Sequence, residues 1–445
     1  MATANKLFLG IAVLALLFVL VGVFCASATL WHPAAVVFAV ATALGFGAFP
    51  QLSGYRFTLW ILAAVVSAMI YPNFFLSLGP FDFKFFQVSA IDLQNKWLFL
   101  IIIQLVMFGM GTKMSFKDFA GVAKMPYPVI IGVGLQFLVM PLLGYSLAKL
   151  FAFPPEIAAG VVLIGSCSSG LASNVMCFLA GANLALSITL TAVATLFAPL
   201  ATTFWMQMLA GEFVEIDSRA MLLEIVKIVL VPIGAAMLHD YLKHSSVQKK
   251  RIVVSLALIC AGIIILLLLK DYQAFESFDF PISTPVFEAI LMTCGAVAFG
   301  VAYHFVASRF PSIDRNIHLI SMFGIIYFTA VTTAAGRDNL LVAGMALILA
   351  AIIHNLAGYG LGYSLSRLAG LDKNSALTVA FEVGMQNGGM ASGLARFMGK
   401  LGTVGLAAAV FSPWMNISGS ILAMQVRRHR LSKTDNNDRS ENSSD

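Results

Sequence analysis

The chain has 445 residues, of which 60% are hydrophobic and only 11% are charged, and its formal net charge is +6. A soluble domain carries about 25% charged residues, so this composition excludes an ordinary water-soluble protein. Apolar runs such as 340–366 are long enough for a helix to cross a bilayer and lack the alternation of barrel strands. We therefore predict an all-α polytopic membrane protein.

Hydropathy predicts about fourteen transmembrane helices along the chain. The expected spans are 7–29, 33–50, 57–77, 96–113, 125–150, 156–180, 184–210, 220–242, 252–270, 286–309, 316–336, 340–366, 375–398 and 402–426. The polar residues 427–445 are expected to form a disordered tail. The first span follows Lys6 and could be a removable signal peptide, but we expect it to be retained because the charge balance requires it.

The distribution of Lys and Arg predicts the orientation. With the basic tail inside and the spans alternating, most basic residues fall on the cytoplasmic side, and acidic loops such as 212–217 fall outside. Both termini are then cytoplasmic. Because no transit-peptide signature is present, we expect a bacterial inner membrane.

The sequence contains an internal repeat. The segment 144–150 reappears as 362–368, and Gly170-Leu171-Ala172-Ser173 reappears at nearly matching spacing as Gly389-Met390-Ala391-Ser392. On the predicted topology the two copies have opposite orientation, which is typical of secondary transporters. The alternative is a chance recurrence of small residues where membrane helices pack closely.

Each copy contains a helix that should be broken. Glycine and hydroxyl residues fill 165–174 in the first copy, and a glycine-rich stretch fills 382–393 in the second. Such residues hold a continuous helix poorly. Interrupted segments at matching places in two halves indicate a transporter's binding site.

Glu382 is the most informative residue, because its neighbours 377–383 are otherwise mostly apolar and a carboxylate at that depth is costly. One interpretation is a ligand for a hard monovalent cation, with nearby hydroxyl and amide oxygens. A second is a proton-binding group. The third is a carboxylate that caps a broken helix or pairs with Lys or Arg.

Gln136 lies in the apolar run 130–140 and aligns with His354 in the repeat. A buried Gln is often an interhelical hydrogen-bonding residue, but its place beside a broken helix equally suits a cation ligand. His354 and Asn355 are expected to make interhelical hydrogen bonds, because no metal-ligating partner lies at suitable spacing.

No enzyme chemistry is indicated. Phosphate-loop and nucleophile-elbow patterns are absent, nothing suggests nucleic-acid binding, and no cofactor is expected. Glu224 and Lys227 are interpreted as a local pair or interfacial residues, and Gln104 as a packing residue. The five cysteines are expected to be free thiols.

Several separated motifs resemble the bile acid:sodium symporter family, in the family's order and spacing. The resemblance covers roughly residues 55–426, less an insertion. The motifs are Met107-Phe108-Gly109-Met110-Gly111, Leu135-Gln136-Phe137, Ser173-Asn174 followed by Ser187 and Thr191, and Glu382-Val383-Gly384-Met385-Gln386-Asn387.

The resemblance implies a ten-helix core of two inverted five-helix repeats with two crossing broken helices. The repeats correspond to residues 55–212 and 213–426. Two extra helices precede them in 1–54, and a two-helix insertion lies near 245–312. Both additions contain an even number of helices, so the core keeps its orientation.

The resemblance also implies the ligands. One sodium site would use Ser173, Asn174, Ser187, Thr191 and Glu382. A second would use Gln136, Glu382, Val383, Met385 and Gln386, with backbone carbonyls from Val383 and Met385.

Three residues are assigned to the substrate. Asn387 would face it, and Leu171 and Gly388 depart from the family's usual hydroxyl residues. Leu171 should lie at the anion's end of the pocket, and Gly388 should add freedom to the second break.

The sequence therefore predicts a sodium-coupled symporter that imports an organic anion, such as a bile acid, a keto acid or another carboxylate, by alternating access. Its partners would be sodium, that anion and the lipid bilayer. The alternatives are a proton-coupled transporter that uses Glu382, and a non-transporting receptor or scaffold on the same fold.

Overall fold

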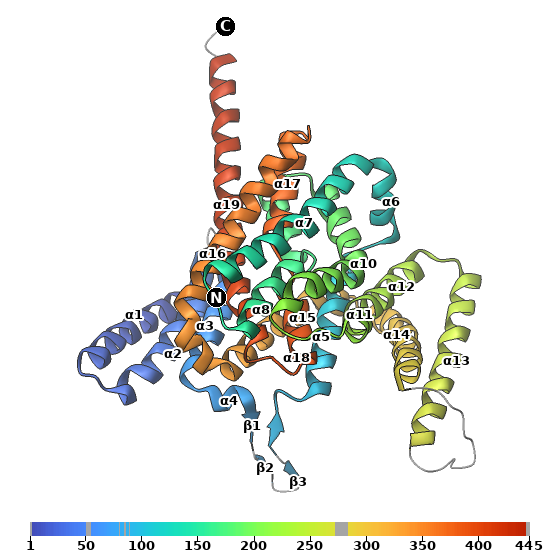
Figure 1. Ribbon diagram of the computed structural model, residues 1–445, viewed down its shortest axis with the longest axis horizontal. Helices are drawn as coiled ribbons and strands as arrows, with labels where there is room; N and C mark the ends of the chain where they lie inside the picture. The colour runs from blue at the N-terminus through green and yellow to red at the C-terminus, as the bar shows by residue number, and fades with distance from the viewer. Residues whose placement is uncertain are drawn as a thin grey trace.

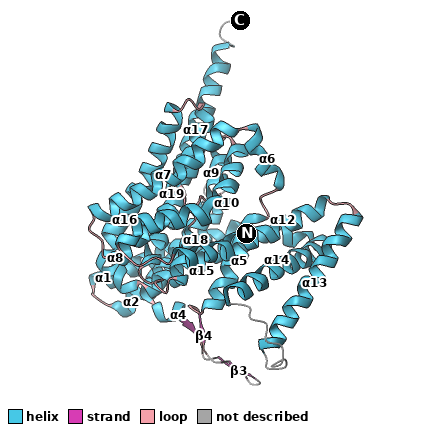
Figure 2. Ribbon diagram, turned by 45° about the vertical axis from the view of Figure 1, so that its right-hand side comes forward, coloured by secondary structure: helices cyan, strands magenta, loops and turns pink. Residues whose placement is uncertain are grey.

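The computed structural model describes residues 2–49, 55–79, 81–83, 86–88, 90–271 and 284–441, and nearly all of them are helical (Figures 1 and 2). The first half of the chain contains α1 (Ala2–Phe24), α2 (Ala28–Gly45), η1 (Phe46–Ala48), α3 (Arg56–Ile70), α4 (Pro72–Leu76), α5 (Lys96–Gly111), α6 (Phe116–Lys124), α7 (Pro126–Leu150), α8 (Pro155–Ser166), α9 (Leu171–Ala180), α10 (Leu184–Leu209) and η3 (Ala210–Glu212).

The second half contains α11 (Ser218–Ile225), the π-helical turn η4 (Val226–Leu230), α12 (Val231–His244), α13 (Val247–Asp271), α14 (Thr284–Arg309), α15 (Pro311–Ala335), α16 (Arg337–Leu368), α17 (Lys373–Gly384), α18 (Gly388–Phe397) and α19 (Val404–Glu441).

The helices confirm the predicted class of all-α polytopic membrane protein. Within the described ranges, nine helices are long and apolar enough to cross a membrane, or ten if the bent pair α5 and α6 forms one span. This number is below the predicted fourteen, in part because α3, α8 and α9 are individually shorter than a full span. The count of fourteen therefore stays a prediction.

A short β-ribbon between α4 and α5 was not predicted. Its strands are β1 (Ser77–Leu78), β2 (Phe81–Phe83), β3 (Phe86–Val88) and β4 (Ile91–Asp92). β1 pairs with β4 and β2 pairs with β3, both antiparallel. The ribbon projects from the lower end of the bundle in Figure 1.

The repeated glycines have similar packing roles. A Cβ at Gly144 of α7 would lie 2.7 Å from the Val161 carbonyl oxygen of α8, and a Cβ at Gly362 of α16 would lie 3.1 Å from the Ala380 Cα of α17. Because neither glycine has a side chain, each long helix lies directly against the first half of a broken helix.

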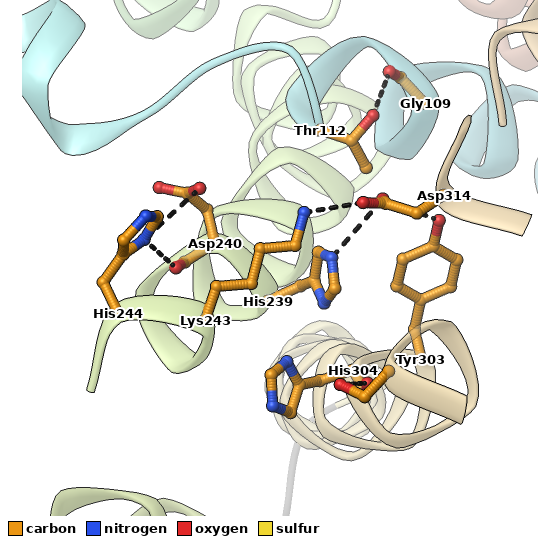
Figure 3. A network of polar contacts seen from close by, with 10 residues as sticks. Gly109, Thr112, His239, Asp240, Lys243, His244, Tyr303, His304 and Asp314 are labelled. Carbon is orange, nitrogen blue, oxygen red and sulfur yellow. Dashed lines mark hydrogen bonds and ion pairs between the residues drawn. The ribbon is translucent and has the colours of Figure 1, made fainter. Parts of the chain in front are cut away.

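The predicted insertion forms α13 and α14, which stand at one flank of the bundle beside α12 in both views (Figures 1 and 2). A polar cluster joins α12, α14 and the start of α15 (Figure 3). Lys243 Nζ lies 2.6 Å from Asp314 Oδ2, Tyr303 donates to Asp314 Oδ1 at 3.3 Å, and His239 Nε2 lies 3.4 Å from the same oxygen. The loop between α13 and α14, residues 272–283, lies outside the described residues.

At the carboxyl end, α19 continues as a helix to Glu441, past residue 427 where we expected a disordered tail to begin. No glycine or proline lies between Gly419 and Glu441, and a helix that is already nucleated extends at little cost. Figure 1 shows this helix projecting from the bundle.

Candidate functional site

Both predicted helix breaks are present, and they lie against each other. α8 ends at Ser166, the chain becomes extended at Cys167, and α9 begins at Leu171. α17 ends at Gly384 and α18 begins at Gly388. The two interruptions are joined by an antiparallel bridge between Ser169 and Gln386 and by a 2.8 Å hydrogen bond from the Asn387 N–H to the Ser168 carbonyl. We call this meeting point the crossing.

The carboxyl ends of the first half-helices are held by amide side chains from neighbouring helices. Gln136 of α7 donates from Nε2 to the Cys167 carbonyl at 3.0 Å. Asn355 of α16 donates from Nδ2 to the Gly384 carbonyl at 2.8 Å. The last carbonyls of a helix have no partner within it, so these bonds stabilise the breaks.

Glu382 occupies the last turn of α17 and is only 2% exposed. Its carboxylate accepts hydrogen bonds from Ser169 Oγ at 2.5 Å, Ser187 Oγ at 2.5 Å and Thr191 Oγ1 at 2.9 Å. Ser169 lies in the first break, and the other two hydroxyls lie one helical turn apart on α10. The crossing thus gathers hydroxyl groups around one buried acid.

The Asn174 amide oxygen completes this oxygen cluster. It lies 2.7 Å from Ser187 Oγ and 3.2 Å from Thr191 Oγ1. Each hydroxyl has one hydrogen, so two hydrogens serve four close contacts to Glu382 and Asn174. The cluster is therefore rich in oxygen lone pairs. Ser173, the remaining residue of the first predicted sodium set, donates its hydroxyl to the Gly170 carbonyl at 2.7 Å, and its side chain also interacts with Glu382.

Within the described part of the chain, no cationic side chain neutralises Glu382. Among the described residues, no Lys, Arg or His nitrogen lies within 4.0 Å of its carboxylate. The interpretation as a carboxylate paired with Lys or Arg is therefore wrong. A buried carboxylate without countercharge is costly, so this arrangement suits a bound cation.

The second predicted set forms a neighbouring amide group. Gln136 Nε2 donates to Gln386 Oε1 at 2.9 Å, and Gln386 Nε2 donates to the Val383 carbonyl at 2.7 Å. Met385 is fully buried beside them. Gln136 Oε1 is buried and has no hydrogen-bond partner. Gln136 thus makes interhelical hydrogen bonds and also presents a free oxygen, so the structure is compatible with both of its predicted roles.

The residues assigned to the substrate lie at the same crossing. Asn387 caps α18, because its Oδ1 accepts from the Met390 N–H at 3.0 Å, while its Nδ2 faces the Met107 sulfur at 3.9 Å. Leu171 is half-buried at the start of α9. Gly388 packs against α19, where a Cβ would lie 1.9 Å from Ser412 Oγ. This tight contact is opposite to the freedom that we expected at Gly388.

Ser169 was missing from the predicted ligand set, whereas Asn355 makes the interhelical hydrogen bond that we expected of it. Ser169 binds Glu382 and Asn355 binds the end of α17. Ser169 lies inside the predicted break, and a search for hydroxyls there could have found it. Asn355 directly follows His354, the residue that aligns with Gln136 in the repeat, so the repeat alignment pointed to its immediate neighbour.

The expectations for Lys227 and His354 are confirmed. Lys227 forms an ion pair with Glu224 three residues earlier, and His354 lies 2.9 Å from the Met140 carbonyl. Gln104, which we expected to be a packing residue, instead makes a hydrogen bond to a neighbouring element, because its Nε2 donates to the Lys227 carbonyl at 3.2 Å. All five cysteines are free.

Two broken helices that cross inside an apolar bundle, with polar groups gathered at the crossing, are typical of secondary membrane transporters. Comparison with known proteins agrees with this class. The model described as Sodium Bile acid symporter family matches residues 100–275.

Three relatives illustrate the similarity. The "Uncharacterized sodium-dependent transporter YocS" of Bacillus subtilis (strain 168) is 29% identical over 374 residues, which are 84% of this chain and 91% of the relative. The "Probable sodium/metabolite cotransporter BASS1, chloroplastic" of Arabidopsis thaliana is 29% identical over 74% of this chain and 66% of its own length. The "Ileal sodium/bile acid cotransporter" of Homo sapiens is 27% identical over 64% of this chain and 65% of its own length.

The chain is therefore similar to the sodium bile acid symporter family and to sodium-dependent transporters, which are transporters rather than enzymes.

Proposed function

We propose that the chain is a symporter that couples the inward movement of sodium to the uptake of an organic anion by alternating access. The observation that carries this proposal is the oxygen cluster at the crossing. Glu382, Asn174, Ser187 and Thr191 approach one another with too few hydrogens for all their contacts, and no side-chain cation lies beside them in the described part of the chain. A sodium ion would supply the missing charge and accept the free lone pairs.

A second sodium site is proposed beside the first. The unpartnered Gln136 Oε1 is the observation that supports it, because a buried acceptor without a partner costs about 1–3 kcal/mol and a cation would remove that cost. Glu382 and Gln386 would contribute side-chain oxygens, and Val383 and Met385 would contribute carbonyls. Both Gln386 and the Val383 carbonyl are already in this hydrogen-bonded group.

The substrate would bind next to the same breaks. α9 and α18 both begin at the crossing, and the N–H groups at the start of a helix favour an anion. Leu171, Asn387 and Gly388 occupy these starts, so they are the proposed substrate-facing residues. Because sodium and anion would stabilise the same arrangement of the breaks, each should strengthen binding of the other by about 1–3 kcal/mol.

We also propose how the chain is arranged in the membrane. Residues 55–212 and 213–426 would form two inverted five-helix repeats, with α1 and α2 before them and α13 and α14 inserted. Fourteen spans would leave both termini in the cytoplasm of a bacterial cell, with the protein in its inner membrane. The similar packing of Gly144 and Gly362 against the first halves of the two broken helices supports this division.

The proposal is tested by thermal unfolding of the purified protein in sodium chloride against potassium chloride. A ligand that binds only the folded state at 100 times its Kd adds about 2.7 kcal/mol of stability. We expect such a sodium-specific gain in the wild type and none in Glu382→Gln. The matched control is Glu156→Gln, because Glu156 forms an ion pair with Lys400 away from the crossing. Equal stabilisation by sodium in wild type and Glu382→Gln would refute the sodium site.

The proton-coupled alternative predicts a different result. If Glu382 carries a proton instead of binding sodium, proteoliposomes should accumulate substrate under a pH gradient in the absence of sodium.

A further inference from the structure

A second polar site lies away from the crossing, where the inserted helix meets the core. A cavity of about 400 Å³ is bounded by α5, the α11–η4 segment, α14 and α18. Its volume falls within the range of roughly 300–1,000 Å³ that is common for small-molecule sites. Apolar walls come from residues such as Phe99, Leu291 and Phe397, and charged side chains come from several elements. We call it the Lys227 cavity.

The charges in this cavity are unevenly paired. Three cationic residues, Lys96, Lys227 and Arg396, line it with two acids, Glu224 and Glu288. Both acids bind the same cation: Lys227 Nζ forms an ion pair with Glu224 and lies 2.7 Å from Glu288 Oε2. In the described part of the chain, neither Lys96 nor Arg396 has a carboxylate within 4.0 Å. The cavity therefore has an excess of positive charge, which favours an anion.

The two acids on Lys227 are held differently. The Glu224 side chain is only 9% exposed and lies one helical turn from Lys227, so it is a fixed partner. The Glu288 side chain belongs to the inserted helix α14 and is 40% exposed. A half-exposed ion pair contributes little free energy, so another carboxylate can replace Glu288 at small cost.

The local backbone conformation and its contacts hold Lys227 in position to bind a carboxylate. Lys227 lies in the π-helical turn η4, and such turns are frequent at functional sites. Gln104 of α5 donates to the Lys227 carbonyl at 3.2 Å and also contacts the Met292 sulfur of α14 at 3.5 Å. One side chain thus ties together the three elements that surround the ammonium group.

The cavity also adjoins the crossing through α18. Gly393 lines the cavity, and a Cβ there would lie 2.3 Å from Ile103 Cδ1, so α18 is closely packed against α5. Asn387 lies six residues earlier on the same helix, which is about 9 Å along its axis. A ligand in the cavity would therefore lie close to the proposed substrate residues.

We propose that the Lys227 cavity binds an amphipathic carboxylate, and that Glu288 of the inserted helix occupies the position of the ligand's carboxylate on Lys227 until the ligand displaces it. Lys227 and Arg396 hold the charged group, and the apolar walls hold the body of the ligand. This inference rests on the proposed transport of an organic anion, and it adds an entry site that uses the insertion.

The test is equilibrium binding of radiolabelled cholate, a bulky amphipathic carboxylate, to the purified full-length protein in sodium chloride at constant ionic strength. Glu288→Gln removes the competing carboxylate, so the Kd should fall about two- to fivefold. Lys227→Gln and Arg396→Gln remove a charged donor, and each should raise the Kd by about tenfold or more.

Glu212→Gln is the matched control, because Glu212 also forms an ion pair with a lysine, Lys149, and its side chain is 49% exposed, similar to that of Glu288. It should leave the Kd unchanged. Weaker binding in Glu288→Gln, or a Kd equal to that of the control, overturns the inference, as does a wild type that binds no cholate. Because Lys227→Gln also leaves Glu224 without its cation, Glu288→Gln is the deciding variant.

Measurements with choline in place of sodium distinguish a failure of this inference from a failure of the proposed function. If sodium gives the wild type no thermal stabilisation relative to choline while Glu288→Gln still binds cholate more tightly, sodium coupling fails and the cavity stands. If sodium strengthens cholate binding but Glu288→Gln has no effect, the cavity fails and sodium coupling stands.

Discussion

The crossing and the Lys227 cavity both place carboxylates among apolar helices, but they neutralise them in different ways. At the crossing, Glu382 is surrounded by hydroxyls and amides, and no cationic side chain lies within ion-pair distance in the described residues. In the cavity, Glu224 and Glu288 share Lys227. In the cavity the chain supplies its own cation, whereas at the crossing the buried acid would have to bind a cation from outside or carry a proton.

The two regions also differ in how tightly their backbones are packed. Gly165, at the end of α8, would place a Cβ 2.5 Å from the Met140 carbonyl oxygen, which belongs to the backbone and cannot rotate away. Gly295 in the inserted helix α14 would place a Cβ with nothing within 4 Å. Gly165 therefore tolerates less change than Gly295 does.

The largest expected effect follows from this difference in packing. Gly165→Ala should lower the free energy of unfolding by about 1–3 kcal/mol, because α7 and α8 must separate. Gly295→Ala should be neutral or raise it by up to about 1 kcal/mol, because alanine favours a helix more than glycine does. Thermal unfolding of the two variants in the same detergent measures the contrast. A loss of stability in Gly295→Ala equal to that in Gly165→Ala would contradict it.

A smaller effect is expected from two adjacent serines in the first break. Ser169 Oγ binds the Glu382 carboxylate at 2.5 Å, whereas Ser168 Oγ is buried without a partner. Ser169→Ala should weaken sodium binding by about 1–2 kcal/mol, because a hydrogen bond to a charged group is lost.

Ser168→Ala is the control and should leave sodium binding unchanged. The sodium concentration that gives half of the maximal thermal stabilisation is the quantity to compare. If the two variants require the same concentration, Ser169 does not support the sodium site.

The smallest effect is expected where α17 begins, at the opposite end of the helix that carries Glu382. Asp372 is an exposed N-cap that accepts from the N–H groups of Asn374 at 2.8 Å and Ser375 at 3.1 Å. The Ser375 side chain, together with these N–H groups, lowers the pKa of Asp372 below its ordinary value. Asp372→Ala should cost about 1 kcal/mol at neutral pH.

Because the folded state lowers this pKa, the contribution of the Asp372 charge is complete above the unfolded pKa of about 3.9 and is lost as pH falls through the folded pKa. Asp372→Asn keeps the cap without the charge, so its stability should not show this acid-dependent loss. Unfolding measured from neutral to acidic pH compares the three proteins. An identical acid profile in wild type and Asp372→Asn would contradict the assignment.

Much of the fold could be predicted from local patterns in the sequence. Long apolar runs predict membrane helices because a backbone in lipid must satisfy its own hydrogen bonds. The glycines and hydroxyls of 165–174 and the glycines of 382–393 predict helix breaks, and both breaks are present. The β-ribbon and the helical extension of α19 were missed, because neither depends on an apolar pattern.

The sequence by itself determined the helical membrane class, the two breaks and the burial of Glu382, because each depends on residues close together in the chain. Only the tertiary structure decided which groups meet. Ser169, Ser187 and Glu382 come from three separate helical segments, and Gln136 and Gln386 are far apart in sequence. The pairing of Lys227 with Glu288 likewise depends on how the inserted helix α14 docks against η4. Such contacts are set by the packing of whole helices, which no local pattern encodes.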